Sequence, residues 1–199
     1  MPHNKVSTLL ERELATLQES GRAKGAETVI RGVVPSRGDF GPRFLLEGEG
    51  EKPFLRMNSN NYLGLSFHPE VIAAEEATAQ NLGAGPGAVR FISGTWQPHI
   101  ELERRLARFH GREAAMIFSS AYAAVMGLIP PLASEQTAIL SDELNHNCII
   151  NAMRLARPHV RKVYPHLQVW ELEQNLRELR GQCRRVIIVT DGIFSMRGD

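Results

Sequence analysis

Short apolar segments alternate with amphipathic segments along the chain from Phe54 onward, and this alternation restricts the fold more than any other feature. The spacing of apolar residues predicts helices over residues 70–80, 98–110, 122–132, 147–156 and 169–180. Short apolar runs between them predict strands over residues 115–118, 138–140, 161–164 and 185–189. Strands that alternate with helices indicate an α/β fold, in which a largely parallel sheet is covered by helices on both faces.

Residues 1–53 have a different pattern. Apolar residues at helical spacing predict an amphipathic helix from residue 5 to about residue 20. Residues 25–53 are rich in glycine, proline and charge, and their short apolar runs at 28–34 and 44–46 suit edge strands or extended arms. We therefore expect a boundary after residue 53.

Composition excludes several classes of partner. The 23 basic and 22 acidic residues give a net charge of +1, so neither nucleic acid nor an anionic membrane is an expected partner. Cys148 and Cys183 form no CxxC pair, and His146 with Cys148 has no further ligand at a recognised spacing, so no metal site or disulfide framework is expected. Charged residues interrupt the amino terminus and exclude an apolar signal core. We expect a soluble protein of the cytoplasm.

A turn of small residues follows the predicted strand at 115–118. Residues 119–124 read SSAYAA and lead directly into a predicted helix. The first N–H groups of a helix have no intrahelical acceptor and the helix dipole favours an anion there, so Ala121 and Tyr122 can bind a phosphate. Small residues at such a place can also simply allow close helix packing, and this alternative stays open.

His146 and Ser195 follow later predicted strands in the same way. The ring of His146 can stack on a planar ligand whose phosphate occupies the preceding turn, or it can be an exposed residue of a helix start that a neighbour caps. Ser195 lies beyond the strand at 185–189. Ligands of parallel sheets bind outside the carboxyl ends of the strands. The convergence of these groups therefore favours a phosphate-bearing ligand.

Two further segments carry groups suited to a ligand. Residues 58–65 (NSNNYLGL) concentrate side-chain amides, and Asn60 among them can bind a carboxylate or form an Asx turn. Residues 82–90 (LGAGPGAVR) follow no predicted strand, so close approach of the backbone to a ligand or partner subunit is favoured over a dinucleotide site. Arg90 and His99 can serve anions or act as structural partners.

Together these residues resemble the α-oxoamine synthase family of pyridoxal-phosphate enzymes. The similarity runs in order over about residues 54–199. It is carried by residues 60–65 (NNYLGL), 89–95 (VRFISGT), 141–146 (SDELNH) and 191–196 (DGIFSM). Within the family, these motifs look most like those of the glycine C-acetyltransferase and 8-amino-7-oxononanoate synthase branches.

The resemblance implies an aspartate-aminotransferase-like fold of type I, a three-layer sandwich with a largely parallel sheet that is incomplete in this sequence. Residues 54–199 are then the first part of the large cofactor-binding domain, preceded by an amino-terminal helix and extended arm. The implied cofactor is pyridoxal 5′-phosphate. The implied reaction condenses a glycine-like amino acid with an acyl-CoA to give an α-oxoamine, in a homodimer in which residues 83–95 face the neighbouring subunit.

The resemblance also implies roles for single residues. Ala121 and Tyr122 correspond to the phosphate turn, and Ser195 to the group near the phenolic oxygen of the cofactor. His146 corresponds to the catalytic histidine that stacks on the pyridine ring and, with Asn60, contacts the substrate.

The Schiff-base lysine of the family, and the aspartate that keeps the pyridine nitrogen protonated, cannot be assigned to any residue here. Lys5, Lys24, Lys52 and Lys162 all lie outside a small-residue loop that follows a strand. We therefore expect the amino-terminal portion of a longer enzyme, which alone would associate through an unpaired sheet edge. Two alternatives stay open: a truncated non-catalytic paralogue that binds a phosphate ligand or a partner subunit, and an aminotransferase or lyase of the same fold.

Overall fold

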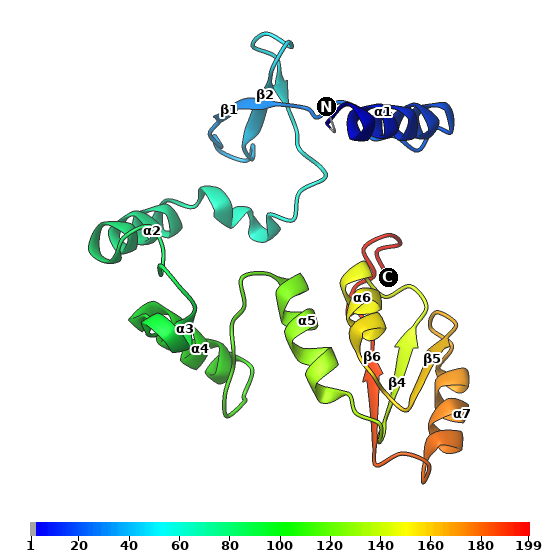
Figure 1. Ribbon diagram of the computed structural model, residues 1–199. Coiled ribbons are helices and arrows are strands. Elements are labelled where there is room, and N and C mark those ends of the chain that lie inside the picture. The colour runs from blue at the N-terminus through cyan, green and yellow to red at the C-terminus, as the bar shows by residue number, and fades with distance from the viewer. Residues whose placement is uncertain (1–2) are drawn as a thin grey trace. The chain divides into compact units, whose positions relative to one another are not determined.

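The computed structural model describes residues 3–199, which fall into two units (Figure 1). One unit is Met1–Gly87 and the other is Ala88–Asp199. This division lies elsewhere than the boundary expected after residue 53. That expected boundary marks the start of a cofactor-binding domain, and it stays a prediction.

The first unit begins with the predicted amphipathic helix, α1 (His3–Glu19). A small antiparallel sheet follows, with the strand order β1 (Ile30–Val34), β2 (Arg43–Leu46) and β3 (Pro53–Phe54). The strands expected near residues 28–34 and 44–46 are thus confirmed. The first is an edge strand, whereas the second is the central strand, because β2 pairs with both β1 and β3.

A kinked helical segment closes the first unit. The 3₁₀ segment η1 (Tyr62–Phe67) contains two left-handed residues, Leu63 at φ 60° and Gly64 at φ 68°, and it leads into α2 (Pro69–Leu82). Phe44 of β2 packs edge-on against Phe67, with ring centroids 6.0 Å apart. Within the described part of this unit, Phe44 is the one buried side chain.

The second unit is built on a parallel sheet in the order β5-β4-β6, formed by β4 (Thr137–Asp142), β5 (Val160–Tyr164) and β6 (Arg185–Val189). Every residue of the central strand β4 is buried. Asp142 pairs with Tyr164 of β5, and Ser141 pairs with Val189 of β6. The carboxyl ends of the strands therefore lie together at one edge.

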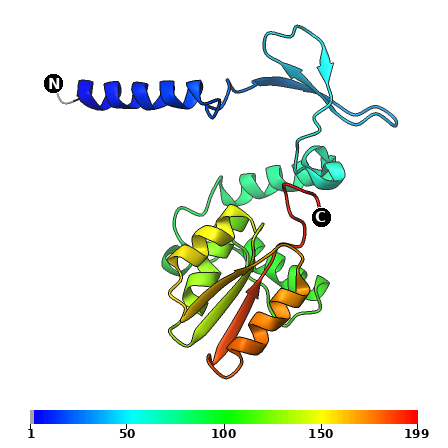
Figure 2. The same cartoon turned by 90° about the vertical axis from the view of Figure 1, so that its right-hand side faces the viewer.

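Helices cover both faces of this sheet, as Figure 2 shows. On one face α5 (Ala121–Leu132) and α6 (Asn147–Leu155) pack against Ile139. On the other face α7 (Val169–Leu179) packs against Leu140 and Tyr164. Neighbouring residues of a strand point to opposite faces, so Ile139 and Leu140 belong to different layers. The predicted three-layer α/β class is confirmed.

The expected strand at 115–118 is wrong: these residues form no strand. No neighbouring strand pairs with them in the described part of the chain, and a strand without a partner leaves its backbone polar groups unsatisfied. Met116 is accordingly 72% exposed.

Two helices precede this segment, the short α3 (Arg90–Ser93) and the longer α4 (Gln97–Phe109). The helix expected at 98–110 is confirmed by α4, whereas α3 was not predicted. No helix found in residues 3–199 combines the length and the apolar character needed to cross a bilayer.

Candidate functional site

One buried side chain, Asn145, ties the loop after β4 to the loop after β6. Its Nδ2 donates to Ser141 Oγ at 2.8 Å and to the Val189 carbonyl oxygen at 2.7 Å, and its Oδ1 accepts the Asp191 N–H at 2.9 Å. The amide nitrogen and oxygen both have partners, so burying this group leaves no unpaired polar atom. The carboxyl ends of the two strands are thereby fixed relative to each other.

His146 directly follows this link and is the N-cap of α6. Its backbone N–H donates to Asp191 Oδ2 at 2.7 Å. Its ring Nδ1 accepts the Cys148 N–H at 3.1 Å and lies 3.0 Å from Cys148 Sγ. Because a nitrogen that accepts a hydrogen bond carries no proton, this network assigns the proton of the neutral ring to Nε2. The exposed imidazole of His146 therefore caps the helix, while its Nε2–H has no partner among residues 3–199 and is available to a ligand.

The start of α5 offers backbone donors. Ser120 is its N-cap, and Ser120 Oγ accepts the Ala123 N–H at 3.0 Å. The N–H groups of Ala121 and Tyr122 lie in the first turn, where a helix has no acceptor of its own. Asn151 Nδ2, in the middle of α6, donates to the Tyr122 hydroxyl oxygen at 3.0 Å, which joins the first turn of α5 to α6. Two donors that have no acceptor in the described part of the chain, at the positive end of a helix, form an arrangement suited to an anion.

Ser195 lies in a compact turn after β6. The Phe194 N–H donates to the Asp199 carbonyl oxygen at 2.8 Å, and the Gly198 N–H donates to the Phe194 carbonyl oxygen at 2.7 Å. Phe194 is buried, whereas Ser195 is exposed. Within residues 3–199, no hydrogen bond joins Ser195 to His146 or Tyr122. The backbone nevertheless places the turn after the same sheet edge that carries His146.

A buried ionic cluster, which no sequence signal singled out, lies against this turn. His166 follows β5, and its Nδ1 lies 3.0 Å and 3.1 Å from the two carboxylate oxygens of Asp142. Its Nε2 lies 3.3 Å from Asp199 Oδ2. Phe194 packs edge-on against the imidazole, with ring centroids 4.4 Å apart. The side chains of His166 and Asp142 are only 5% and 2% exposed.

Burial and hydrogen bonding oppose each other in this cluster. Burial raises the pKa of Asp142, but donation from the Leu144 N–H, the His166 ring and the Leu167 N–H outweighs it, so the pKa is lowered overall. Burial lowers the pKa of His166, but its bonds to Asp142 and Asp199 outweigh that effect, so the pKa is raised overall. The cluster therefore favours an imidazolium between carboxylates.

Asn60 belongs to the first unit, where it lines a cavity of about 320 Å³ together with Phe44, Arg56 and Asn61. Its carbonyl oxygen accepts the Tyr62 N–H at 2.8 Å. Its side chain has no hydrogen-bond partner in the described part of the chain, so its amide is available to a ligand. The neighbouring Asn61 instead uses Oδ1 to accept from the backbone and the hydroxyl of one serine.

Arg90 is a structural partner rather than a free anion ligand. It binds Glu103 through its two terminal guanidinium nitrogens, Nη1 and Nη2, at 2.6 Å and 3.0 Å. The Ile117 N–H also donates to Glu103, at 3.1 Å. The Arg90 bond and the Ile117 bond together lower the pKa of Glu103 to about 2. The pair therefore attaches residue 117 to α4.

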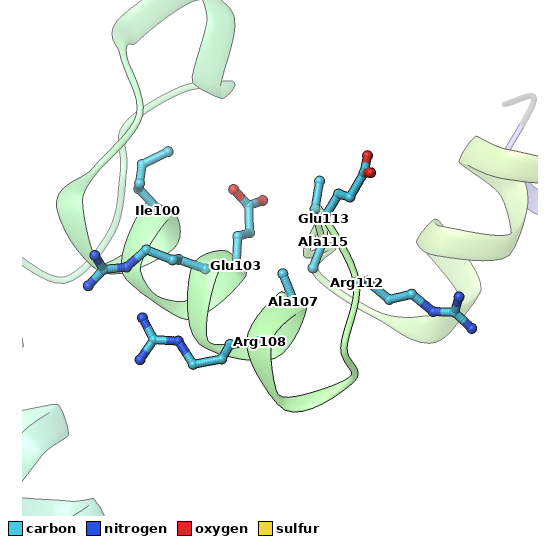
Figure 3. A pocket seen from close by; sticks show the side chains of 9 residues that line it. Ile100, Glu103, Ala107, Arg108, Arg112, Glu113 and Ala115 are labelled. Atoms are coloured by element: carbon cyan, nitrogen blue, oxygen red, sulfur yellow. The ribbon is translucent and has the colours of Figure 1, made fainter.

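A second cavity, of about 500 Å³, lies between α4 and residues 112–115 (Figure 3). Glu103 lines it but is already bound to Arg90. In Figure 3 the side chains of Arg108 and Arg112 point in opposite directions, so they do not converge on a common ligand. None of the predicted site residues lines this cavity. The candidate site is therefore the carboxyl edge of the sheet.

Known proteins resemble this chain over most of its length. It is 41% identical over 189 residues to an 8-amino-7-oxononanoate synthase of Coprothermobacter proteolyticus, covering 95% of this chain and 45% of that protein. It is 42% identical over 191 residues to the mitochondrial 2-amino-3-ketobutyrate coenzyme A ligase of Homo sapiens, covering 96% and 43%. A solved serine palmitoyltransferase from S. paucimobilis, with bound PLP–myriocin aldimine, matches with a TM-score of 0.80 and 28% identity, covering 96% and 45%. The chain thus spans less than half the length of these relatives.

Residues 52–199 match the family described as aminotransferase class I and II, and this match covers more than half of the chain. The likeness to the serine palmitoyltransferase structure confirms the predicted aminotransferase-like fold. The synthase and ligase relatives confirm the resemblance drawn from the four sequence motifs. The chain belongs to the aminotransferase class I and II family.

Proposed function

We propose that this chain supplies the phosphate turn and the ring-facing groups of a pyridoxal-phosphate-dependent C-acyltransferase. The reaction would condense a glycine-like amino acid with an acyl-CoA to give an α-oxoamine. The observation that carries this proposal is the meeting of two features at the carboxyl edge of the sheet. They are the donor-bearing start of α5 and the His146 cap of α6, two helices that the Tyr122–Asn151 hydrogen bond links.

The residues present fit the phosphate and the ring of this cofactor. The N–H groups of Ala121 and Tyr122 would hold the phosphate, because the N-cap bond of Ser120 leaves both of them free. The exposed His146 ring would stack on the pyridine. The Cys148 N–H holds the ring through Nδ1, and Asp191 holds the His146 backbone through its N–H. When bound, pyridoxal phosphate supplies an electron sink for the amino-acid substrate.

The hydroxyl group of Ser195 and the side-chain amide of Asn60 complete the proposed roles. The exposed Ser195 hydroxyl would lie near the phenolic oxygen of the cofactor. Asn60, whose amide has no partner among the described residues, would contact the substrate carboxylate. His146 is likewise assigned a substrate contact, by its place in the motif at residues 141–146. We assign Asn60 its role by its place in the motif at residues 60–65 and by that free amide.

The substrate class and the assembly are further parts of the proposal. Relatives named 8-amino-7-oxononanoate synthase and 2-amino-3-ketobutyrate coenzyme A ligase support the pairing of an amino acid with an acyl thioester. The family match begins at residue 52, next to the expected start of the cofactor-binding domain at residue 54. We further propose a homodimer that works in the cytoplasm.

The activity is tested on the protein as its gene encodes it. We expect free thiol to be released from an acyl-CoA when glycine and pyridoxal phosphate are supplied. His146→Ala should lower that rate by about a hundredfold or more, in the range that one catalytic side chain contributes. The control is His159→Gln, which changes an exposed histidine of the same unit. Amino transfer to a 2-oxo acid without thiol release would overturn the acyltransferase and favour an aminotransferase.

The phosphate turn has its own test. Ala121→Pro removes one backbone donor but suits the first residue of a helix, and the preceding Ser120 is already extended at φ −160° and ψ 161°. We expect about tenfold weaker binding of pyridoxal phosphate, the value of one hydrogen bond to a charged group. Binding of pyridoxal, which lacks the phosphate, should not change. Equal weakening of both ligands would remove Ala121 from the phosphate site.

A further inference from the structure

Two separate anchors hold the segment that follows β6. The first is Asn145 with His146, whose hydrogen bonds fix Asp191 at 2.9 Å and 2.7 Å. The second is His166, which contacts Phe194 and Asp199 at the two ends of the next turn. The first anchor includes His146 of the proposed site, whereas none of the residues of the second anchor has a role in the proposed function.

The turn at residues 194–199 is closed by its own backbone. Phe194 and Asp199 share a 2.8 Å hydrogen bond, and the N–H groups of Arg197 and Gly198 both donate to the Phe194 carbonyl oxygen, at 3.2 Å and 2.7 Å. A turn closed in this way moves as one piece, so contacts at both of its ends fix the four residues between them. Ser195 is the first of these four.

We propose that His166 is a positioning residue that clamps this turn, and with it Ser195, to the carboxyl ends of β4 and β5. Its Nδ1–H donates to Asp142 at the end of β4, its Nε2–H donates to Asp199, and its ring packs against Phe194. The function of Ser195 rests on the proposed activity. The clamping of the turn does not depend on it.

The surroundings of His166 supply the opposite charge that such a clamp needs. Asp142 from β4 and Asp199 from the turn face its two ring nitrogens, and the Glu143 carboxylate accepts its backbone N–H at 2.9 Å. Tyr164, two residues earlier at the end of β5, is also titratable, and it is buried and hydrogen-bonded to Thr190. An imidazole with a carboxylate at each nitrogen donates twice only when it is protonated.

Asp142 gives the clamp a rigid base. Its carboxylate also accepts the Leu144 N–H at 2.9 Å and the Leu167 N–H at 3.2 Å. Leu167 has the left-handed φ of 58°, which is uncommon for a residue with a branched side chain and persists only where the surroundings enforce it. The loop that carries His166 is therefore fixed to β4 by contacts that do not involve the turn at residues 194–199.

The test compares variants by amide hydrogen exchange and histidine NMR on the protein as its gene encodes it, without cofactor. His166→Asn keeps a donor for Asp142 but is too short to reach Asp199, so the fold should persist. We expect exchange at Arg197 and Gly198 to quicken about tenfold, since one charge-assisted hydrogen bond is lost, while amides of β4 stay unchanged. His159→Gln is the matched control, because His159 is an exposed histidine of the same unit.

Two further variants separate a clamp from a merely structural histidine. Asp199→Asn should lower the titration midpoint of the His166 ring and loosen the turn as His166→Asn does. The double variant should loosen it no further, because both changes break one interaction. Three outcomes would each overturn the clamp. They are unchanged exchange at residues 197 and 198 in His166→Asn, additive effects in the double variant, and a titration midpoint of the His166 ring that is the same in Asp199→Asn. These readouts need no turnover, so failure of the proposed activity leaves them interpretable.

Discussion

The two units of this chain place similar apolar residues in opposite surroundings. In Met1–Gly87, Leu9 and Leu14 of α1 are 57% and 56% exposed, although they form a regular apolar stripe. In Ala88–Asp199, Ile139 and Leu140 of β4 have no exposed surface at all. An apolar stripe is enough to specify a helix. A hydrophobic core also needs a second layer of secondary structure, and among the described residues the parallel sheet has a layer of helices on both faces.

The largest expected effect tests this contrast directly. Leu140→Ala should lower the free energy of unfolding by about 2–5 kcal/mol, because it leaves a cavity between β4 and α7. Leu9→Ala removes the same atoms from an exposed site and should change that free energy by no more than about 0.5 kcal/mol. Chemical denaturation followed by far-ultraviolet circular dichroism reports on the helices of both units. Equal losses in the two variants would mean that the α1 stripe is buried in solution.

A smaller effect is expected at the polar edge of the same sheet. Asn145→Ala leaves the Val189 carbonyl and the Asp191 N–H without their partner and should cost about 1–3 kcal/mol. Exchange at the Asp191 amide should quicken in parallel. Asn58→Ala, at an exposed position of the other unit, serves as the control and should have little effect. If Asn145→Ala also proved neutral, the link between β4 and β6 would contribute no stability.

The smallest effect is a dependence of stability on pH that is confined to Ala88–Asp199, the unit that contains the parallel sheet. The pKa of His166 is raised by its carboxylate partners, so its stabilisation is complete below the unfolded value of about 6.5 and is lost as pH rises through the folded value. The pKa of Asp142 is lowered, so its stabilisation is present above about 4 and is lost as pH falls through its folded value.

The measurement is thermal unfolding followed by tryptophan fluorescence. Both tryptophans of the chain, Trp96 and Trp170, lie in Ala88–Asp199, so the signal reports on that unit. Tm should fall as pH rises through the folded pKa of His166, and His166→Asn should flatten this slope. A slope that survives in His166→Asn would assign it to another group.

Local patterns predicted most of the elements because most elements depend on local patterns. The helices α2, α4, α5, α6 and α7 and the strands β4, β5 and β6 all lie where periodicity placed them. The segment 115–118 was predicted wrongly because a strand also needs a neighbour, which no local pattern reports. The segment η1 was missed because its kink depends on the left-handed backbone of Leu63 and Gly64.

In the candidate site, too, the residues that follow local patterns were predictable and those that depend on distant partners were not. His146 and the start of α5 were predictable because each follows a recognisable strand or turn. The His166 cluster was not, because its partners Asp142 and Asp199 lie 24 and 33 residues away and meet it only in the folded unit. An isolated histidine after a strand carries no signal of such a pairing.

The Asn145 link also bears on chemical ageing. Deamidation of an asparagine needs its side-chain carbonyl carbon to be attacked by the backbone nitrogen of the next residue. In this fold that nitrogen belongs to His146 and is bound to Asp191, while the amide itself is held by Ser141 and Val189. Conversion to aspartate would set a carboxylate oxygen against the Val189 carbonyl oxygen and part the two strand ends. Damage at Asn145 is therefore slow while the edge is closed, and the amount found in an aged sample records how often that edge has opened.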